Sequence, residues 1–252
     1  MKRQDSYDRV LAVYRENYFS RYSADQVEGG RNKLFNHILD LLEEKKKIGK
    51  LLDVGTGCGF FLVAAQKRGW GVKGIEPSVQ SVEVAQKQYG IDVFNGTLRE
   101  YDRDGKFDAI TFINVLEHSV EPWKEIDRAK NLLKSRGIIF LRFPNGLLHT
   151  RIYRLALKYG LANEIQKFLV FHQFSFTPRF IRRLLSDWGF SGITTLSSPP
   201  SEGDPNSLLY RPTLAQFTKR SLHLMAKAVE VISGGKILLS TSFEVSAVKK
   251  VS

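Results

Sequence analysis

The sequence predicts an α/β domain whose sheet is mostly parallel and is covered by helices on both faces. From Lys50 onward, short apolar segments alternate with segments of helical periodicity. The apolar segments are nearly continuous, which is typical of strands buried on both faces. A chain of 252 residues, 42% of them hydrophobic, is long enough for one such domain with an accessory region.

Seven strands and six helices are expected along the chain. The strands are expected at 51–54, 71–75, 91–94, 107–113, 137–143, 193–196 and 243–248. The helices are expected at 24–46, 60–67, 79–88, 122–134, 178–188 and 214–232.

Several helix starts carry chemical signals. Ser78 and Thr177 each precede a helical segment and can cap its first N–H groups. Pro122 suits the first position of a helix because its fixed φ matches the helix and its missing N–H would have no partner there. The segment 23–26 has the spacing of a capping box for the N-terminal helix.

The domain organisation follows from where the strand and helix alternation holds. We expect residues 1–48 to form an aromatic arm and a helix packed on the core, and residues 49–252 to form the main domain. Within it, the basic, amphipathic insertion 145–175 is expected to close over the ligand cleft as a helical lid. An amphipathic helix at about 213–232 is expected before the last strand.

The sharpest motif is a glycine loop where the first strand turns into a helix. It contains Asp53, Gly55, Gly57 and Gly59 in the pattern D-x-G-x-G-x-G. Glycines let the chain turn tightly and approach a ligand closely. Dinucleotide enzymes usually have G-x-G-x-x-G instead. A carboxylate at Asp53 would repel a pyrophosphate, and it suits a ligand that carries an ammonium and a sulfonium.

A second carboxylate ends the next strand. Glu76 lies 23 residues after Asp53, at a strand tip where it can accept the two hydroxyls of a ribose. A glycine triplet alone can be a plain tight turn. The triplet with both carboxylates, in register with two strands, indicates a site for an adenosyl ligand.

Three segments together resemble a known enzyme family. They are 53–59 (DVGTGCG), 74–78 (GIEPS) and 107–118 (FDAITFINVLEH). They are similar to the motifs of class I S-adenosylmethionine-dependent methyltransferases, most of all the branch that includes ubiquinone-biosynthesis O-methyltransferases. The resemblance runs from about 50 to 197 and includes the strand near 243–248. It implies a Rossmann-like seven-stranded sheet of order 3-2-1-4-5-7-6, and S-adenosyl-L-methionine as cofactor.

The resemblance also implies roles for individual residues. Asp53 would bind the amino group of the cofactor, Glu76 the ribose hydroxyls, and the strand tip at Asn114 and Val115 the centre of the cofactor. The remaining cofactor-binding residues would be Gly55, Thr56, Gly57, Gly59, Pro77, Gly96, Thr97 and Leu98. Thr56 departs from the Cys or Ala that is frequent in the family, although a small residue still fits.

Two histidines are candidates for a catalytic base. Methyl transfer mainly requires alignment and exclusion of water, but a hydroxyl acceptor must also lose its proton. His118 follows the fourth strand and has a suitable ordinary pKa, although it can instead order the loop around the cofactor. His172 precedes a capped helix in a segment that closes the acceptor pocket in the resembling family; a histidine bonded to backbone among aromatics is the alternative.

Charge and cysteine content limit the partners and the compartment. The net charge is +12, and the segment 142–183 contains eight Lys or Arg and one acid. This favours an anionic or lipid-like acceptor or weak contact with an anionic membrane, unless it is only a solvated basic face. A single cysteine, Cys58, fits a reducing compartment. We expect a cytoplasmic protein with no metal site, with peripheral membrane contact as the alternative.

The expected function is transfer of a methyl group to a small molecule, on a hydroxyl oxygen, by in-line displacement. An RNA methyltransferase is an alternative because the chain is basic, although no RNA-binding pattern is present and nucleic acid is not the expected partner. A non-catalytic cofactor-binding protein is a second alternative, disfavoured by Asp53 and Glu76. The glycine spacing disfavours a nicotinamide-dependent oxidoreductase.

Overall fold

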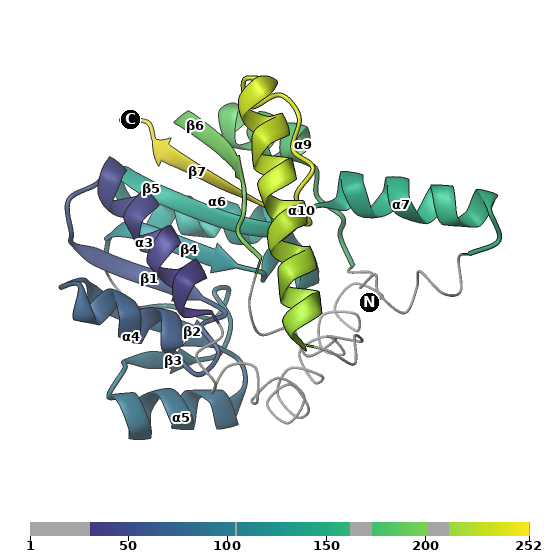
Figure 1. Cartoon of the computed structure of the whole chain (residues 1–252). Helices are drawn as coiled ribbons and strands as arrows, with labels where there is room; N and C mark the ends of the chain where they lie inside the picture. Colours follow the sequence, from purple (N-terminus) through teal and green to yellow (C-terminus); the bar gives the residue numbers. More distant parts are fainter. Residues whose placement is uncertain (1–30, 104, 162–172, 201–211, 252) are drawn as a thin grey trace, which may run out of the picture.

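The architecture is a single sheet with helices on both faces (Figure 1). The computed structural model describes residues 31–103, 105–161, 173–200 and 212–251. The sheet has seven strands in the order β3-β2-β1-β4-β5-β7-β6, which confirms the expected order. Among the described helices, none has both the length and the apolar character needed to cross a membrane.

Six of the seven strands run in the same direction, and β7 runs against its two neighbours. The strands that pair in parallel are β1 (Lys50–Val54), β2 (Gly71–Glu76), β3 (Val93–Asn95), β4 (Phe107–Ile113) and β5 (Leu133–Pro144). β7 (Ser242–Lys249) is antiparallel to both β5 and β6 (Phe190–Ser197). Because β1 to β5 are parallel, their carboxyl ends meet at one edge of the sheet, where ligands bind in such folds.

The helices divide between the two faces according to their buried side chains. One core cluster holds apolar residues of α3 (Asn32–Lys45), α4 (Phe60–Lys67) and α5 (Val79–Tyr89). The other holds residues of α6 (Pro122–Leu132) and α9 (Pro178–Asp187). α10 (Pro212–Ile232) contacts β6 and lies on the same side of the sheet as α3 (Figure 1).

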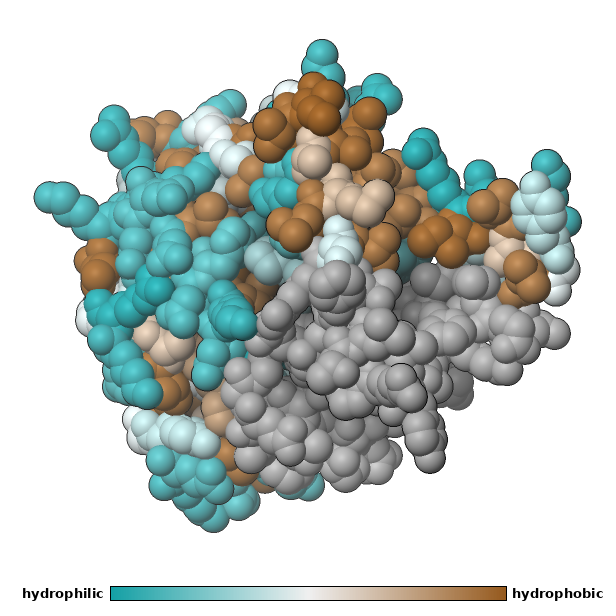
Figure 2. All heavy atoms as spheres, in the orientation of Figure 1, coloured by the Kyte–Doolittle hydropathy of each residue, from teal (hydrophilic) through white to brown (hydrophobic). Residues whose placement is uncertain are grey.

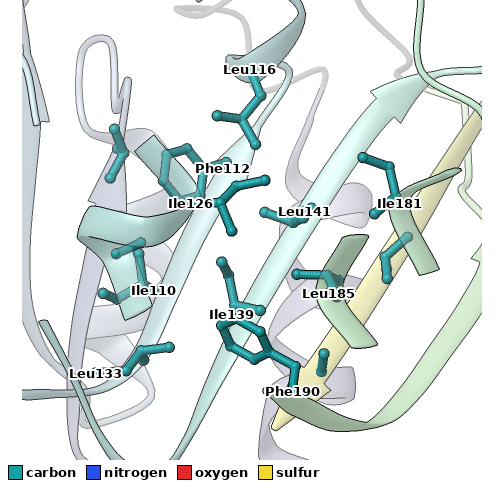
Figure 3. Close-up of a cluster of buried hydrophobic side chains, with 14 of the residues drawn as sticks. Ile110, Phe112, Leu116, Ile126, Leu133, Ile139, Leu141, Ile181, Leu185 and Phe190 are labelled. Atoms are coloured by element: carbon teal, nitrogen blue, oxygen red, sulfur yellow. The ribbon is translucent and has the colours of Figure 1, made fainter. Parts of the chain in front are cut away.

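The core on the α6 and α9 side shows how the sheet and these helices hold each other. Ile139 and Leu141 of β5 point between Ile126 of α6 and the pair Ile181 and Leu185 of α9 (Figure 3). All five side chains are completely buried. Burial of each such side chain stabilises the fold by roughly 1.5–3 kcal/mol.

The largest difference between a predicted and an observed element boundary concerns the start of β5. The helix expected to reach residue 134 ends at Leu132, and β5 begins at Leu133 instead of 137. Leu133 pairs with Phe107 of β4, so the partner strand draws the chain into the sheet before the apolar run begins. The helix expected at 24–46 is described from Asn32 on, and the predicted capping box at 23–26 lies outside the described residues.

The insertion after β5 contains α7 (Gly146–Lys158), which extends away from the layers of the sheet (Figure 1). Asn145 caps it by accepting from the Leu148 N–H at 3.3 Å. Residues 162–172 lie outside the described part of the chain. The role of the insertion as a lid therefore stays a prediction.

Shortening a core side chain between β5 and α9 should destabilise the protein. Leu185→Ala is expected to lower the free energy of unfolding by about 2–5 kcal/mol, because it leaves a cavity in a fully packed layer. Leu157→Ala on α7 is the matched control, since Leu157 is exposed, and should change it by less than about 0.5 kcal/mol. Urea unfolding measures both, and equal effects would contradict the packing described here.

Candidate functional site

The glycine loop lies between β1 and α4, at the carboxyl edge of the sheet. Gly55, Gly57 and Gly59 all have positive φ, of 72°, 55° and 80°. A Cβ on Gly55 would lie 2.5 Å from Cγ2 of Val115, so this backbone and the tip of β4 approach each other closely. The N–H groups of Gly55 and Thr56 both donate to the Ile75 carbonyl, at 2.8 and 3.1 Å. The loop is thereby held against β2.

The Glu76 carboxylate fastens the same loop from the end of β2. Its Oε2 accepts from the Gly57 N–H at 2.8 Å, and its Oε1 accepts from the Ser78 N–H at 3.0 Å. The side chain is only 3% exposed, and burial raises its pKa. Each carboxylate oxygen keeps a further lone pair that can accept a ligand hydroxyl.

Asp53 lies one strand away, next to the last residue of β1. Its Oδ1 accepts from the Thr111 hydroxyl of β4 at 2.6 Å. Burial raises the pKa of Asp53 to about 7, and the neighbouring Glu76 carboxylate adds to this shift. A cationic ligand at this position would stabilise the carboxylate and lower that pKa.

The predicted adenine-binding segment follows β3. The Gly96 N–H donates to the Glu76 carbonyl at 3.1 Å, and the Asn95 amide donates to the Pro77 carbonyl at 3.3 Å. Thr97 donates through its backbone and its hydroxyl to Glu100. Leu98 is 1% exposed and belongs to the hydrophobic core, so its side chain is part of the packing beneath the site.

The tip of β4 has an unusual backbone. Asn114 has a φ of 59°, a left-handed conformation that few non-glycine residues adopt. Its side chain accepts a hydrogen bond from the Arg142 guanidinium and donates to Glu117 Oε1 at 3.1 Å. These two contacts hold the turn that places Val115 against Gly55.

Sequence reasoning missed the part that Arg142 and Glu117 play in this arrangement. Arg142 was counted with the basic surface, but it is buried, and its guanidinium also donates to the Ser198 hydroxyl at 2.7 Å and the Pro199 carbonyl at 3.2 Å. Burial lowers the pKa of Arg142 to about 10. Its place inside a predicted apolar strand, between Leu141 and Phe143, was the available signal.

Glu117 is a buried carboxyl group directly behind the tip of β4. It is 1% exposed, burial raises its pKa to about 7, and its Oε2 has no hydrogen-bond partner among the described residues. It lies in the 3-10 turn η1 (Leu116–His118) together with the predicted base candidate His118, which is partly buried.

The second histidine candidate, His172, lies outside the described residues. The chain that follows it is joined to η1, since the Phe174 N–H donates to the Glu117 carbonyl at 3.1 Å. Phe174 also makes an edge-to-face contact with Trp123, with ring centroids 5.8 Å apart, and stacks on Phe176. An aromatic wall therefore borders the tip of β4 on this side.

The single cysteine and the expected lack of a metal site concern other kinds of chemistry. Cys58 is buried in the glycine loop, and burial raises the pKa of its thiol, which makes it a poor nucleophile. Within the part of the chain that the structure describes, no group of three or more His, Cys, Asp or Glu side chains could hold a metal ion.

Comparison with known proteins identifies similar sequences. A family model described as a methyltransferase domain matches residues 26–195. The ubiquinone biosynthesis O-methyltransferase of Actinobacillus pleuropneumoniae serotype 5b is 33% identical over 124 residues, which are 44% of this chain and 53% of that protein. The protein of the same name from Histophilus somni is 37% identical over 107 residues, 38% of this chain and 45% of that protein. The chain thus spans about half the length of these curated relatives.

Solved structures with the same fold cover nearly the whole chain. The magnesium protoporphyrin IX methyltransferase of Synechocystis PCC 6803 with bound SAH has a TM-score of 0.64 and 18% identity, covering 96% of this chain and 98% of that one. A phospholethanolamine N-methyltransferase of Haemonchus contortus has a TM-score of 0.60 and 17% identity, covering 94% of this chain and 60% of that one. At these identities the likeness establishes the Rossmann-like fold.

The buried Asp53 should make the stability of the ligand-free protein fall as pH rises. Because its folded pKa of about 7 exceeds the ordinary 3.8, the stability it contributes is present below pH 3.8 and is lost as pH rises through about 7. Between pH 5 and 8 the loss should be on the order of 2 kcal/mol. Burial raises the pKa of Glu117 and Glu125 to about 7 as well, so these two groups add to the measured loss. Asp53→Asn should therefore remove its own share, on the order of 2 kcal/mol, in urea unfolding, whereas Asp102→Asn, at an exposed position, should leave the loss unchanged. A wild-type slope that Asp53→Asn preserves would show that another group causes it.

Proposed function

Because this chain belongs to the methyltransferase domain family, we propose that it transfers a methyl group from S-adenosyl-L-methionine to a small-molecule acceptor. The observation that carries the proposal is the pair of buried carboxylates, Asp53 and Glu76, at the ends of adjacent strands around the glycine loop. The family match covers both strands.

The described residues fit this cofactor. Its ammonium and sulfonium groups are cations, and Asp53 is a buried carboxyl group with no cation among the described residues that lowers its pKa. Its ribose offers two hydroxyls, and both oxygens of Glu76 have accepting capacity beyond their bonds to Gly57 and Ser78. The segment of Gly96 and Thr97 follows directly on β3, the strand beside Glu76, and would flank the adenine.

When bound, the cofactor supplies a methyl group on a positively charged sulfur, which is an activated leaving group. The protein then has to align the acceptor with that methyl group and keep water away. Asn114, held by Arg142 and Glu117, gives the tip of β4 one fixed conformation. The Trp123 and Phe174 rings supply an apolar surface next to it, and the buried Phe176 supports Phe174 from the core.

The acceptor is proposed to be a small molecule methylated on a hydroxyl oxygen, with an anionic or lipid-like character. The curated relatives with the name ubiquinone biosynthesis O-methyltransferase support the oxygen and the lipid-like character, and the basic segment of the chain supports an anionic one. His118 or His172 would take the proton of that hydroxyl. Cytoplasmic location with peripheral membrane contact remains a prediction.

The alternatives have less support. An RNA methyltransferase would need a surface that binds nucleic acid, and the sequence has no aromatic and basic pattern of that kind. A non-catalytic cofactor-binding protein would not need an apolar wall of the kind formed by Trp123 and Phe174 beside the tip of β4.

Calorimetry with S-adenosylhomocysteine tests the cofactor site. The wild-type protein should bind it, and Asp53→Asn and Glu76→Gln should each weaken binding at least about tenfold, because each loses a charge-assisted hydrogen bond. Asp92→Asn, at the far end of β2 and β3, is the matched control and should leave the affinity unchanged. No binding by folded wild-type protein, or unchanged affinity in both site variants, would refute the proposal.

A screen with isotope-labelled S-adenosylmethionine and extracted small molecules tests the transfer. Labelled product should carry the methyl group on oxygen. Labelling of RNA that is lost after nuclease treatment, with no small-molecule product, would favour the alternative.

His172→Ala should lower the turnover of the acceptor found in this way by about a hundredfold, the contribution typical of a general base. Its affinity for S-adenosylhomocysteine should stay within about twofold of wild type, because His172 is not among the predicted cofactor-binding residues. Gln173→Ala, at the exposed neighbouring position, is the control. Full turnover by His172→Ala would remove this residue from the acceptor pocket.

A further inference from the structure

The outward face of α10 is apolar, whereas the outward face of a solvated helix is normally polar. Its inner side buries Ala226 and Glu230, and the Glu230 carboxylate accepts from the Ser197 N–H of β6 at 3.0 Å. On the opposite side, three to four residues apart, are Leu224, Met225, Ala228, Val231 and Ile232, and Val231 and Ile232 are 76% and 85% exposed. A helix that exposes large apolar side chains in this way marks an interaction surface.

This surface continues across the base of α7. The Asn145 amide, next to α7, donates to the carbonyls of Leu238 and Ser240 at 3.1 and 3.0 Å. The segment after α10, with Ile237 and Leu239 exposed, is therefore fastened to the start of α7. Figure 2 shows hydrophobic residues over α10 and along α7 on this one face of the molecule.

α7 itself has two neighbouring stripes. Leu148, Ile152, Leu155 and Tyr159 recur at helical spacing, and the last three are exposed. Beside them on the helix lies a stripe of exposed cations, which consists of Arg151, Arg154 and Lys158. The segment 146–161 contains no Asp or Glu, and the acid of 221–239, Glu230, is buried.

We propose that this face, defined as α7, the outer side of α10 from Leu224 to Ile232 and the segment 237–239, docks on an anionic lipid surface. Apolar side chains flanked by a stripe of Arg and Lys are what an interfacial helix requires, since the cations reach the lipid phosphates while the apolar side chains enter the acyl boundary. Charge decides against a second copy of the chain, because a symmetric contact through this face would bring two cationic stripes together. The inference goes beyond methyl transfer and does not depend on it.

Vesicle sedimentation of the full chain tests the proposal. The protein should bind vesicles of phosphatidylcholine with phosphatidylglycerol, bind pure phosphatidylcholine at least about tenfold more weakly, and lose binding as salt rises. Val231→Ser with Ile232→Ser should reduce binding several-fold, because it removes apolar insertion. The triple variant Arg151→Ala, Arg154→Ala, Lys158→Ala should reduce it at least about tenfold, because each cation near an anionic surface adds roughly fivefold.

A matched triple variant separates local from overall charge. This control combines Lys47→Ala, Lys67→Ala and Lys87→Ala, at exposed positions on other parts of the chain. It removes the same three positive charges and should leave vesicle binding nearly unchanged. Three outcomes would each overturn the proposal. Both triple variants could lose binding equally, or the wild-type protein could fail to bind. The variant Val231→Ser with Ile232→Ser could also change its oligomeric state while its vesicle binding stays unaltered. Melting curves and S-adenosylhomocysteine affinity, measured alongside, show whether the variants stay folded and test the cofactor site independently.

Discussion

The arrangement of the site depends on the Glu76 carboxylate. It is buried at the end of β2 and accepts N–H groups from the glycine loop and from the start of the next segment, so one side chain joins two chain turns at the edge of the sheet. A carboxylate in this place requires donors that remain fixed, because a buried charge without partners is strongly unfavourable. The positive φ angles of Gly55, Gly57 and Gly59 let the loop supply such a donor without Cβ clashes.

Asp53 and Glu76 are both buried carboxyl groups at neighbouring strand ends, and burial raises the pKa of each. The two backbone donors of Glu76 do not fully offset its burial, nor does the bond from Thr111 offset that of Asp53, whose pKa rises to about 7. The site is thus poised for a cation, and ligand-free protein holds a group whose charge burial disfavours. Residues placed to bind a ligand often lower the stability of the ligand-free protein in this way.

A polar network inside the sheet connects this edge to the rest of the fold. Arg142 of β5 donates hydrogen bonds to Asn114 and Ser198. In the sheet it pairs in register with Glu244 of β7. The Glu244 carboxylate is in turn 2.6 Å from the His37 ring nitrogen of α3. The apolar face of α10 and α7 lies outside this network. The residues proposed to contact lipid are not those proposed to bind the cofactor, so each set can be altered without changing the other.

The sequence by itself determined nearly every element and the glycine loop with its two carboxylates, because these depend on local periodicity, glycine conformation and spacing from strand ends. The strand order followed from the resemblance of its motifs to those of the methyltransferases. Only the tertiary structure decided that Arg142 is buried rather than part of a basic surface and that α10 turns apolar side chains outward. It also decided that Glu117, beside the tip of β4, has an oxygen without a hydrogen-bond partner in the described part of the chain. The physical reason is that hydropathy along the chain shows only that a helix is amphipathic or that a strand is apolar. Which side of an element meets the sheet depends on partners far away in the sequence. Ser198 is such a partner for Arg142, and Ser197 is one for Glu230.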